Sequence, residues 1–234
     1  MDIKAILFDL DGTLLPMDND VFTKGYFRLL AKKLAPHGYD PQELVAAILK
    51  GTEAMVRNDG SATNCDAFWR KFAEVLGEKV YEDKCVFDEF YENEFNDAKQ
   101  FCGFAPKASE IIDSCKKKGY RLLLASNPLF PMAAQKARLG WAGISPDSFE
   151  FISSYENSHF CKPNPEYFSE MTERLKLAPE ECLVIGNDAD EDMAAKNIGA
   201  SVFLLTDCVI NRGNKEITQF PHGGFEELAA FLGI

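Results

Sequence analysis

Basic residues are scarce in this chain of 234 residues. Only 25 lysines and arginines stand against 37 acidic residues, which gives a formal net charge of −12. Proteins that bind nucleic acid or anionic membrane surfaces use basic side chains to neutralise phosphates. We therefore expect no nucleic-acid partner and no membrane partner. A small phosphorylated molecule is not excluded, because one local cation can reverse the field at a site.

Long apolar runs and metal-type cysteine spacings are also missing. No stretch approaches the length of a membrane span, and residues 4–10 are too few for a signal peptide, so we expect no secretory leader. The seven cysteines form no Cys-x-x-Cys pair, and the three histidines have no metal-ligand spacing. These patterns argue against a zinc site and indicate reduced, buried thiols in a cytoplasmic protein.

The chain does have the composition of a folded α/β protein. It is 46% hydrophobic and 26% charged, which is enough apolar material for a full core. Short apolar runs alternate with helical patterns, which predicts a doubly wound parallel sheet. The predicted strands cover residues 5–10, 121–126, 151–154, 183–186 and 202–205. We also predict a helix over 106–118 and another that starts at Asn164-Pro165.

Residues 16–102 break this alternation. They are typical of four consecutive helices, over 21–34, 41–56, 66–76 and 82–99. We predict an α-helical cap domain over 16–102, inserted into an α/β core domain formed by 1–15 and 103–234. Packing inside the cap explains most of its aromatic residues.

The first predicted strand ends in two acids and a glycine. Asp9 and Asp11 are two residues apart, so on an extended chain they point to the same side. A sharp turn at Gly12 would place both carboxylates at the sheet edge, with Thr13 nearby. Acidic turns are common on surfaces, but this pair ends a run too hydrophobic for a surface loop. Ligands of open α/β sheets bind at this edge, so we expect a site here.

Two further segments place polar groups at strand ends. Ser126 ends the second predicted strand, Asn127 can cap the next helix, and Pro128 fits its first turn. Capping alone explains Asn127, whereas the Ser126 hydroxyl could donate to a phosphate oxygen. Lys162 stands between a strand and a helix that starts with proline, which restricts its direction. On its own it would be interpreted as a solvated lysine.

An acidic loop follows the predicted strand 183–186. It contains Asn187, Asp188, Asp190, Glu191 and Asp192. Four neighbouring acids repel one another unless a cation offsets their charge, so they indicate a site for a hard cation. A helix dipole explains one or two of them, but not four. We expect Asp190 and Glu191 to be solvated.

Together, the four segments resemble the haloacid dehalogenase-like hydrolase superfamily, in its phosphatase branch with a helical cap after the first strand. The order D-x-D-G-T, Ser-Asn, Lys-Pro and Gly-Asn-Asp-x-x-x-Asp carries the resemblance, which covers essentially the whole chain. It implies a Rossmann-like core with strand order 3-2-1-4-5 and an active site under the cap.

The resemblance also implies roles for individual residues. Asp9 would be the nucleophile that forms an aspartyl-phosphate, and Asp11 the general acid and later the general base. Ser126 and Lys162 would hold the phosphoryl oxygens. The implied substrate-binding residues are Gly12, Thr13, Ser126, Asn127 and Lys162. The implied Mg²⁺ ligands are Asp9, Asp11 (through its carbonyl), Asn187, Asp188 and Asp192.

One motif departs from the common form. Many members of the superfamily carry Gly-Asp where this chain has Gly186-Asn187, with Asp188 one position later. Either Asn187 or Asp188 would then face the metal. We favour Asp188, supported by Asp192, because a carboxylate binds Mg²⁺ better than an amide.

Asp11 points to phosphoryl chemistry, because true dehalogenases lack an aspartate there. The resemblance thus implies a Mg²⁺-dependent phosphohydrolase that cleaves a small-molecule phosphate monoester through an aspartyl-phosphate on Asp9. A sugar phosphomutase of the same superfamily and a non-catalytic phosphate-binding protein on the same fold are the alternatives. We expect a monomer or a weak homodimer.

The substrate stays open at this level. Candidates for contacts in the cap are Phe22, Tyr26, Arg57 and Asn58, although an exposed helix-end arginine explains Arg57 better. His159 could line the entrance to the site or simply lie in a loop.

Overall fold

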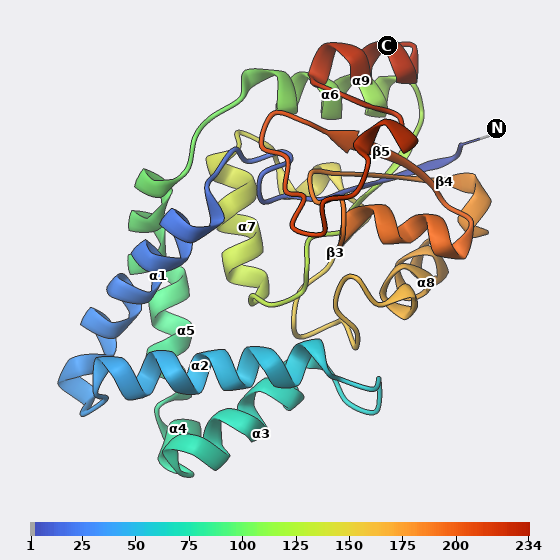
Figure 1. Ribbon diagram of the computed structural model, residues 1–234. Helices are drawn as coiled ribbons and strands as arrows, with labels where there is room; N and C mark the ends of the chain where they lie inside the picture. Colours follow the sequence, from blue (N-terminus) through green and yellow to red (C-terminus); the bar gives the residue numbers. More distant parts are fainter. Residues whose placement is uncertain (1–2) are drawn as a thin grey trace.

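A six-stranded parallel sheet forms the centre of the computed structural model, which describes residues 3–234. The strand order is β3-β2-β1-β4-β5-β6 (Figure 1). The predicted order 3-2-1-4-5 is therefore confirmed, and the short β6 beside β5 was missed. The strands are β1 (Ala5–Phe8), β2 (Arg121–Leu124), β3 (Phe151–Ile152), β4 (Cys182–Gly186), β5 (Ser201–Leu205) and β6 (His222–Gly223).

Helices cover both faces of this sheet, which explains why its strands are continuous apolar runs. Ile6 and Phe8 pack on one face with α6 (Pro106–Lys117), α7 (Met132–Trp141) and α9 (Phe225–Leu232). Ala5 and Leu7 pack on the other face with α8 (Pro165–Leu175) and the 3₁₀ stretch Asp192–Ile198. The alternation along β1 follows from the two-residue period of a strand.

Two predictions about helix starts had different outcomes. Asn164 does cap α8, because its side-chain oxygen accepts a hydrogen bond from the Glu166 N–H at 3.1 Å. The helix predicted to start at Pro128 is wrong, since α7 begins only at Met132. Asn127 precedes Pro128 and Phe130 precedes Pro131, and a residue before proline avoids the helical region.

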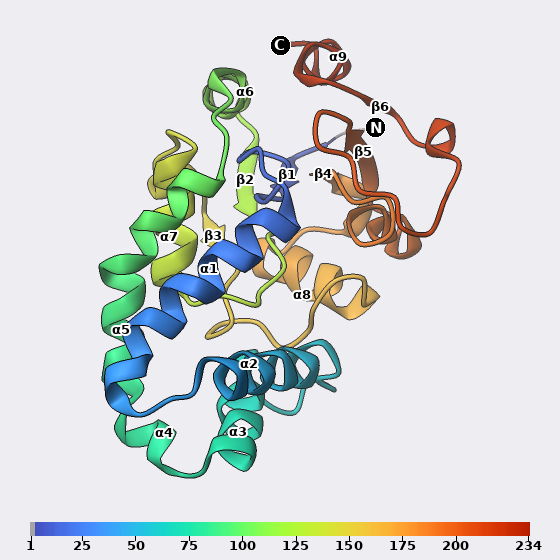
Figure 2. The same ribbon diagram turned by 60° about the vertical axis from the view of Figure 1, so that its left-hand side comes forward.

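Consecutive helices join β1 to β2. They are α1 (Asn19–Leu34), α2 (Pro41–Val56), α3 (Asn64–Leu76), α4 (Lys79–Glu82) and α5 (Lys84–Glu92), with 3₁₀ stretches at Ala35–His37 and Glu94–Phe101. In both views α2, α3 and α4 lie at the opposite end of the molecule from α9 (Figure 1, Figure 2). We call residues 19–101 the helical segment.

The helical segment departs from prediction near its end. A single helix over 82–99 is wrong, because Asn93 (φ −119°, ψ −84°) ends α5 and the chain continues as a 3₁₀ stretch. The two connections to the sheet lie side by side, with Met17 bridged to Cys102 and the Gly103 N–H donating to the Pro16 carbonyl at 2.7 Å. Between residues 3 and 234, no helix combines the length and apolarity needed to cross a membrane.

Candidate active site

The carboxyl ends of β1, β2 and β4 line one cleft, together with the start of α1. Asp9 follows β1, Ser126 follows β2 and Asn187 follows β4, as the parallel topology requires. The structure brings together the ten site residues expected from the sequence. Seven of them line the cleft, namely Asp9, Asp11, Ser126, Asn127, Asn187, Asp188 and Asp192. The other three contact the lining: Lys162 and Thr13 lie within hydrogen-bond distance of Asp9, and Gly12 packs against Asn187.

The turn after Asp9 depends on a glycine. Gly12 has φ +81°, and a Cβ there would lie 2.2 Å from Nδ2 of Asn187. Only glycine accommodates both the backbone conformation and the close approach. The Thr13 hydroxyl lies 2.8 Å from Oδ2 of Asp9 and 3.1 Å from Oδ1 of Asn187. The turn therefore joins the first acidic motif to the loop after β4.

Lys162 is buried between two carboxylates. Its Nζ donates to Oδ1 of Asp9 at 2.9 Å and to Oδ1 of Asp192 at 2.6 Å. Burial alone would lower the pKa of Lys162, but the attraction of Asp192 and Asp9 outweighs it and raises the pKa well above its usual value. Lys162 therefore stays charged and offsets part of the negative charge around Asp9. A surface lysine would have been the default interpretation of this residue alone.

Gly186 is needed for the Asp192 contact. A Cβ on Gly186 would lie 2.1 Å from the Asp192 carboxyl group. The second oxygen of Asp192 accepts a hydrogen bond from the Asp188 N–H at 2.9 Å. Asp192 is thus fixed at both oxygens, and its observed partner is Lys162.

The loop after β4 aims Asp188 into the cleft. Its Oδ1 accepts hydrogen bonds from the Asp190 and Glu191 N–H groups at 2.7 and 2.9 Å. Its Oδ2 lies 3.5 Å from the Arg212 guanidinium, which is largely exposed. Asn187 donates from Nδ2 to the Cys208 carbonyl at 2.7 Å.

Asn127 links two parts of the site instead of capping a helix. Its Oδ1 accepts from the Lys162 N–H at 3.2 Å, and its Nδ2 donates to Oε2 of Glu191 at 3.0 Å. Glu191 lines the cleft, so the expectation of a solvated Glu191 is wrong. Burial raises the pKa of Glu191 above its usual value. Asp190 instead pairs with Lys215 at 3.2 Å, outside the cleft.

Arg138 on α7 is a part of the site that the sequence analysis missed. Its side chain is fully buried, forms an ion pair with Oδ2 of Asp11 and donates to Oε1 of Gln135 at 2.7 Å. Burial raises the pKa of Asp11 above its usual value, although Arg138 opposes the rise. Its spacing from Ala134 was the signal that could have indicated burial of Arg138. Residues four apart share a helix face, and Ala134 lies on the apolar face of this helix.

The donor atoms of the cleft are of the chemical type that a hard divalent cation binds. Six carboxylates line it with a single arginine, and Oδ1 of Asp11 is buried without a hydrogen-bond partner in the described chain. Oxygen donors of this type are those that Mg²⁺ prefers. Across residues 3–234, however, no three His, Cys, Asp or Glu side chains converge closely enough to form a metal-binding group. Lys162 and Arg138 hold three of the carboxylates instead.

The candidate specificity residues fall in different places. Phe22 lines the cleft, and Tyr26 lines a neighbouring cavity. Arg57 is 78% exposed and pairs with Glu53 on its own helix. Asn58 donates to the Ala62 carbonyl and to Asn64. His159 pairs with Glu170 at 2.8 Å and does not line the cleft.

The sequence of this chain is similar to those of a known protein family. The family model of the haloacid dehalogenase-like hydrolases matches residues 3–199. A phosphoglycolate phosphatase of Nitrosospira multiformis is 25% identical over 211 residues, which cover 88% of this chain and 84% of that protein. A bifunctional riboflavin kinase/FMN phosphatase of Arabidopsis thaliana is 29% identical over 209 residues, covering 86% of this chain and 48% of that protein.

The fold has close counterparts among solved structures. The crystal structure of CbbY from Rhodobacter sphaeroides in complex with phosphate aligns with a TM-score of 0.60 at 19% identity. The alignment covers 99% of this chain and 100% of that one. At this identity the likeness supports the fold alone.

Proposed function

The chain belongs to the haloacid dehalogenase-like hydrolase family, and from this premise we propose that it is a Mg²⁺-dependent phosphohydrolase acting on a small-molecule phosphate monoester. The reaction would proceed through an aspartyl-phosphate on Asp9. The observation that best supports this proposal is the setting of Asp9 itself. Its carboxylate stands at the end of β1, nearly buried, with one oxygen near Thr13 and the other held by Lys162.

This setting suits a carboxylate nucleophile. Thr13 and Lys162 fix the orientation of Asp9, and the Lys162 charge offsets part of the repulsion that a phosphate dianion would meet. An Asp9 oxygen would attack phosphorus, and the bond from phosphorus to the ester oxygen would break. Water would then attack the same phosphorus, releasing inorganic phosphate and restoring Asp9.

Asp11 would move the protons in both steps. Its raised pKa favours the protonated form, which can donate to the departing alcohol oxygen. The resulting carboxylate would then accept a proton from the attacking water. Arg138 holds one Asp11 oxygen, so the other oxygen, which is buried and unpaired, is the one available for this exchange.

We propose that Asp9, Asp188 and the Asp11 carbonyl would hold Mg²⁺. The amide of Asn187 is occupied by Thr13 and the Cys208 carbonyl. Asp192 is committed to Lys162, so we place it in a supporting role. When bound, the ion would supply the positive charge that a phosphate dianion needs in a cleft lined by six carboxylates.

We also propose that residues 16–102 form a cap domain over a core formed by 1–15 and 103–234. Asn19, Asp20 and Phe22 of α1 line the cleft together with residues from the strand ends, which supports this division. Ser126, at the end of β2, would contact the phosphoryl group. Seven free cysteines support a cytoplasmic location.

The names of the relatives do not determine the substrate. They refer to phosphoglycolate, which is short and carries two anionic groups, and to FMN, which carries a large aromatic ring system. A sugar phosphomutase must hold a bisphosphorylated sugar and therefore needs a second anion site. In the described chain, the cavity beside the cleft has no lysine or arginine in its lining, which favours the hydrolase over the mutase.

The test is phosphate release from a panel of phosphate monoesters with purified protein. We expect turnover with Mg²⁺, loss of turnover in EDTA, recovery when Mg²⁺ is restored, and no turnover by Asp9→Asn. Asp113→Asn, an exposed site on α6, is the matched control and should behave as wild type. Equal turnover by wild type and Asp9→Asn would refute the role of Asp9, and no turnover of any ester by either protein would leave a non-catalytic phosphate-binding protein as the better alternative.

A further inference from the structure

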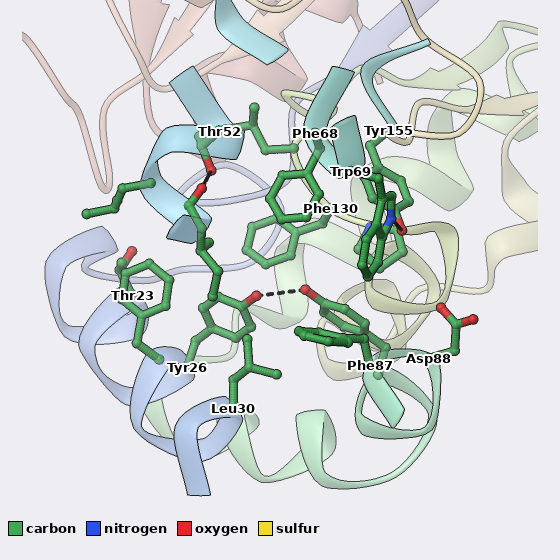
Figure 3. Close-up of a pocket in the computed structure, with 16 residues that line it drawn as sticks. Thr23, Tyr26, Leu30, Thr52, Phe68, Trp69, Phe87, Asp88, Phe130 and Tyr155 are labelled. Atoms are coloured by element: carbon green, nitrogen blue, oxygen red, sulfur yellow. Dashed lines mark hydrogen bonds between the residues drawn. The ribbon is translucent and has the colours of Figure 1, made fainter. Parts of the chain in front are cut away.

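A second cavity lies between the helical segment and the carboxyl edge of the sheet (Figure 3). Its cavity volume is about 170 Å³. Its walls come from α1, α2, α3 and α5 and from the loops after β2 and β3. We call it the aromatic pocket. Its size is similar to that of an apolar cavity that binds a benzene ring.

The aromatic pocket adjoins the catalytic cleft. Thr23, Leu129 and Phe130 line both of them. Phe130 also lies under the Arg138 guanidinium, at 4.4 Å from the ring centroid, and Arg138 in turn pairs with Asp11. The two cavities therefore adjoin at Thr23, Leu129 and Phe130.

Aromatic rings dominate the wall of the pocket. Figure 3 shows the rings of Phe68, Trp69 and Phe130 around one space, with Tyr26 and Phe87 below them. Several of these rings pack edge to face, as in the Trp69–Phe87 pair with centroids 5.4 Å apart. Such walls bind planar apolar groups through ring faces and edges.

The pocket offers no positive charge to an anion. Within the described residues its lining contains no lysine or arginine, and Asp88, its one acidic residue, pairs with Lys84 at 2.7 Å. The Tyr26 and Tyr91 hydroxyls bond each other at 2.7 Å. Burial raises the pKa of Tyr26 to about 12 and that of Tyr91 well above its usual value, so both phenols are neutral. A carboxylate would lose its hydration here without gaining a partner.

We propose that the aromatic pocket binds the organic part of the phosphate ester and that this part is an aromatic or similarly apolar group. A short group with a second negative charge would be a poor substrate. This inference rests on the proposed function, because it assumes that the phosphate occupies the cleft beside Asp9. The pocket would select the ester, whereas the cleft would perform the hydrolysis.

The first test compares esters that leave as primary alcohols, so that chemical reactivity differs little. The substrates are 2-phenylethyl phosphate, ethyl phosphate and phosphoglycolate, and the quantity is kcat/KM. We expect 2-phenylethyl phosphate to exceed both others by about 100-fold, as burial of a whole ring predicts. Equal values, or a preference for phosphoglycolate, would overturn the inference without touching the hydrolase proposal.

Substitutions in the pocket give the second test. Thr52→Phe would fill the pocket from α2 and should remove most of the preference for the phenylethyl ester, with ethyl phosphate unaffected. Val56→Phe adds the same ring to an exposed position on the same helix, outside the pocket, and should change neither value. Leu49 lines the pocket but is 54% exposed, so Leu49→Gln should fold normally. We expect it to lower the preference several-fold, and an unchanged preference in both pocket variants would overturn the inference.

A binding measurement separates the two proposals. Calorimetry would follow 2-phenylethylphosphonate, which cannot be hydrolysed, in wild type, Thr52→Phe and Val56→Phe. If no ester is turned over but the phosphonate binds and Thr52→Phe alone weakens it at least about tenfold, the pocket inference stands and the hydrolase proposal fails. If the phosphonate does not bind, or binds Thr52→Phe as tightly as wild type, the pocket inference fails.

Discussion

The catalytic cleft and the aromatic pocket share a wall but have opposite chemistry. Six carboxylates line the cleft, and its neighbours Lys162 and Arg138 are buried cations. The pocket is lined by rings and neutral phenols. A charged site can polarise a phosphorus centre but discriminates poorly among leaving groups, whereas an apolar site discriminates by shape and hydration. The two proposals together assign the chemistry to the cleft and the selection of the ester to the pocket.

The two regions also differ in how they are built. The cleft depends on backbone turns at strand ends, where a Cβ on Gly12 or Gly186 would come within 2.2 Å of a neighbouring side chain. The pocket depends on the faces that four helices and two loops present to one another. We therefore expect single substitutions to have large effects on activity in the cleft and smaller, graded effects in the pocket.

The largest expected effect is that of replacing Asp9, which should change the chemistry in the cleft without weakening binding in the pocket. Asp9→Asn should lower kcat by at least about 10⁴-fold on any ester, because the nucleophile is lost. Binding of 2-phenylethylphosphonate, measured without Mg²⁺ because Asp9 is a proposed ligand of the ion, should stay as tight as in wild type or become tighter, since the change removes one negative charge from the cleft. A parallel loss of binding in calorimetry would show that the regions do not act separately.

The next effect concerns Asp11. Asp11→Asn should lower kcat on 2-phenylethyl phosphate by about 10²–10⁴-fold, because the alcohol then leaves without a proton. Nitrophenolate leaves without protonation, so 4-nitrophenyl phosphate should give a rapid burst followed by slow turnover. Stopped-flow absorbance checks this. Equal losses on both esters with no burst would argue against a proton-transfer role.

Arg138 tests whether the cleft depends on buried charge. Arg138→Met leaves the Asp11 carboxylate without its buried partner and should lower the free energy of unfolding by about 3–5 kcal/mol. Urea denaturation measures it. Arg57→Met is the control, because Arg57 is mostly exposed and its pair with Glu53 should contribute too little to resolve. A wild-type midpoint for Arg138→Met would contradict the importance of the Asp11 pair.

The smallest effect lies in the pocket. Tyr91→Phe removes the hydrogen bond to Tyr26 and should cost about 1 kcal/mol of stability. The rings keep their places, so KM for 2-phenylethyl phosphate should change by no more than a few-fold, and ethyl phosphate should not respond. Steady-state kinetics checks both esters. A loss comparable to that of Asp11→Asn would mean that the pocket takes part in the chemistry.

The sequence was sufficient to predict the core of the cleft, because the relevant signals are local. A buried strand followed by Asp9, Asp11 and Gly12 determines where the carboxylates lie once the sheet is parallel. Strand order and the position of Lys162 near Asp9 followed from the resemblance to the family. The start of α7 was mispredicted because the two Xaa-Pro steps outweighed the capping signal of Asn127.

The remaining features depend on contacts between distant elements. Arg138 is an ordinary helical arginine until α7 packs beside the turn at Asp11. The aromatic residues of the helical segment were expected to fill its core, and Phe72, Phe90 and Phe95 do so with no exposed surface. Phe68 and Trp69 instead line a cavity whose other wall comes from the loop 129–131. Sequence periodicity identifies an apolar face, but it does not show whether that face meets another side chain or a space.

The most direct test of the central proposal is to search for the covalent intermediate on Asp9. Wild-type protein would be mixed with Mg²⁺ and 2-phenylethyl phosphate, quenched in acid within milliseconds and digested for mass spectrometry. We expect a phosphoryl group on the peptide that carries Asp9, and none on that peptide from Asp9→Asn. Phosphorylation of a different residue during turnover, or turnover with the same yield of intermediate in Asp9→Asn, would contradict the proposal.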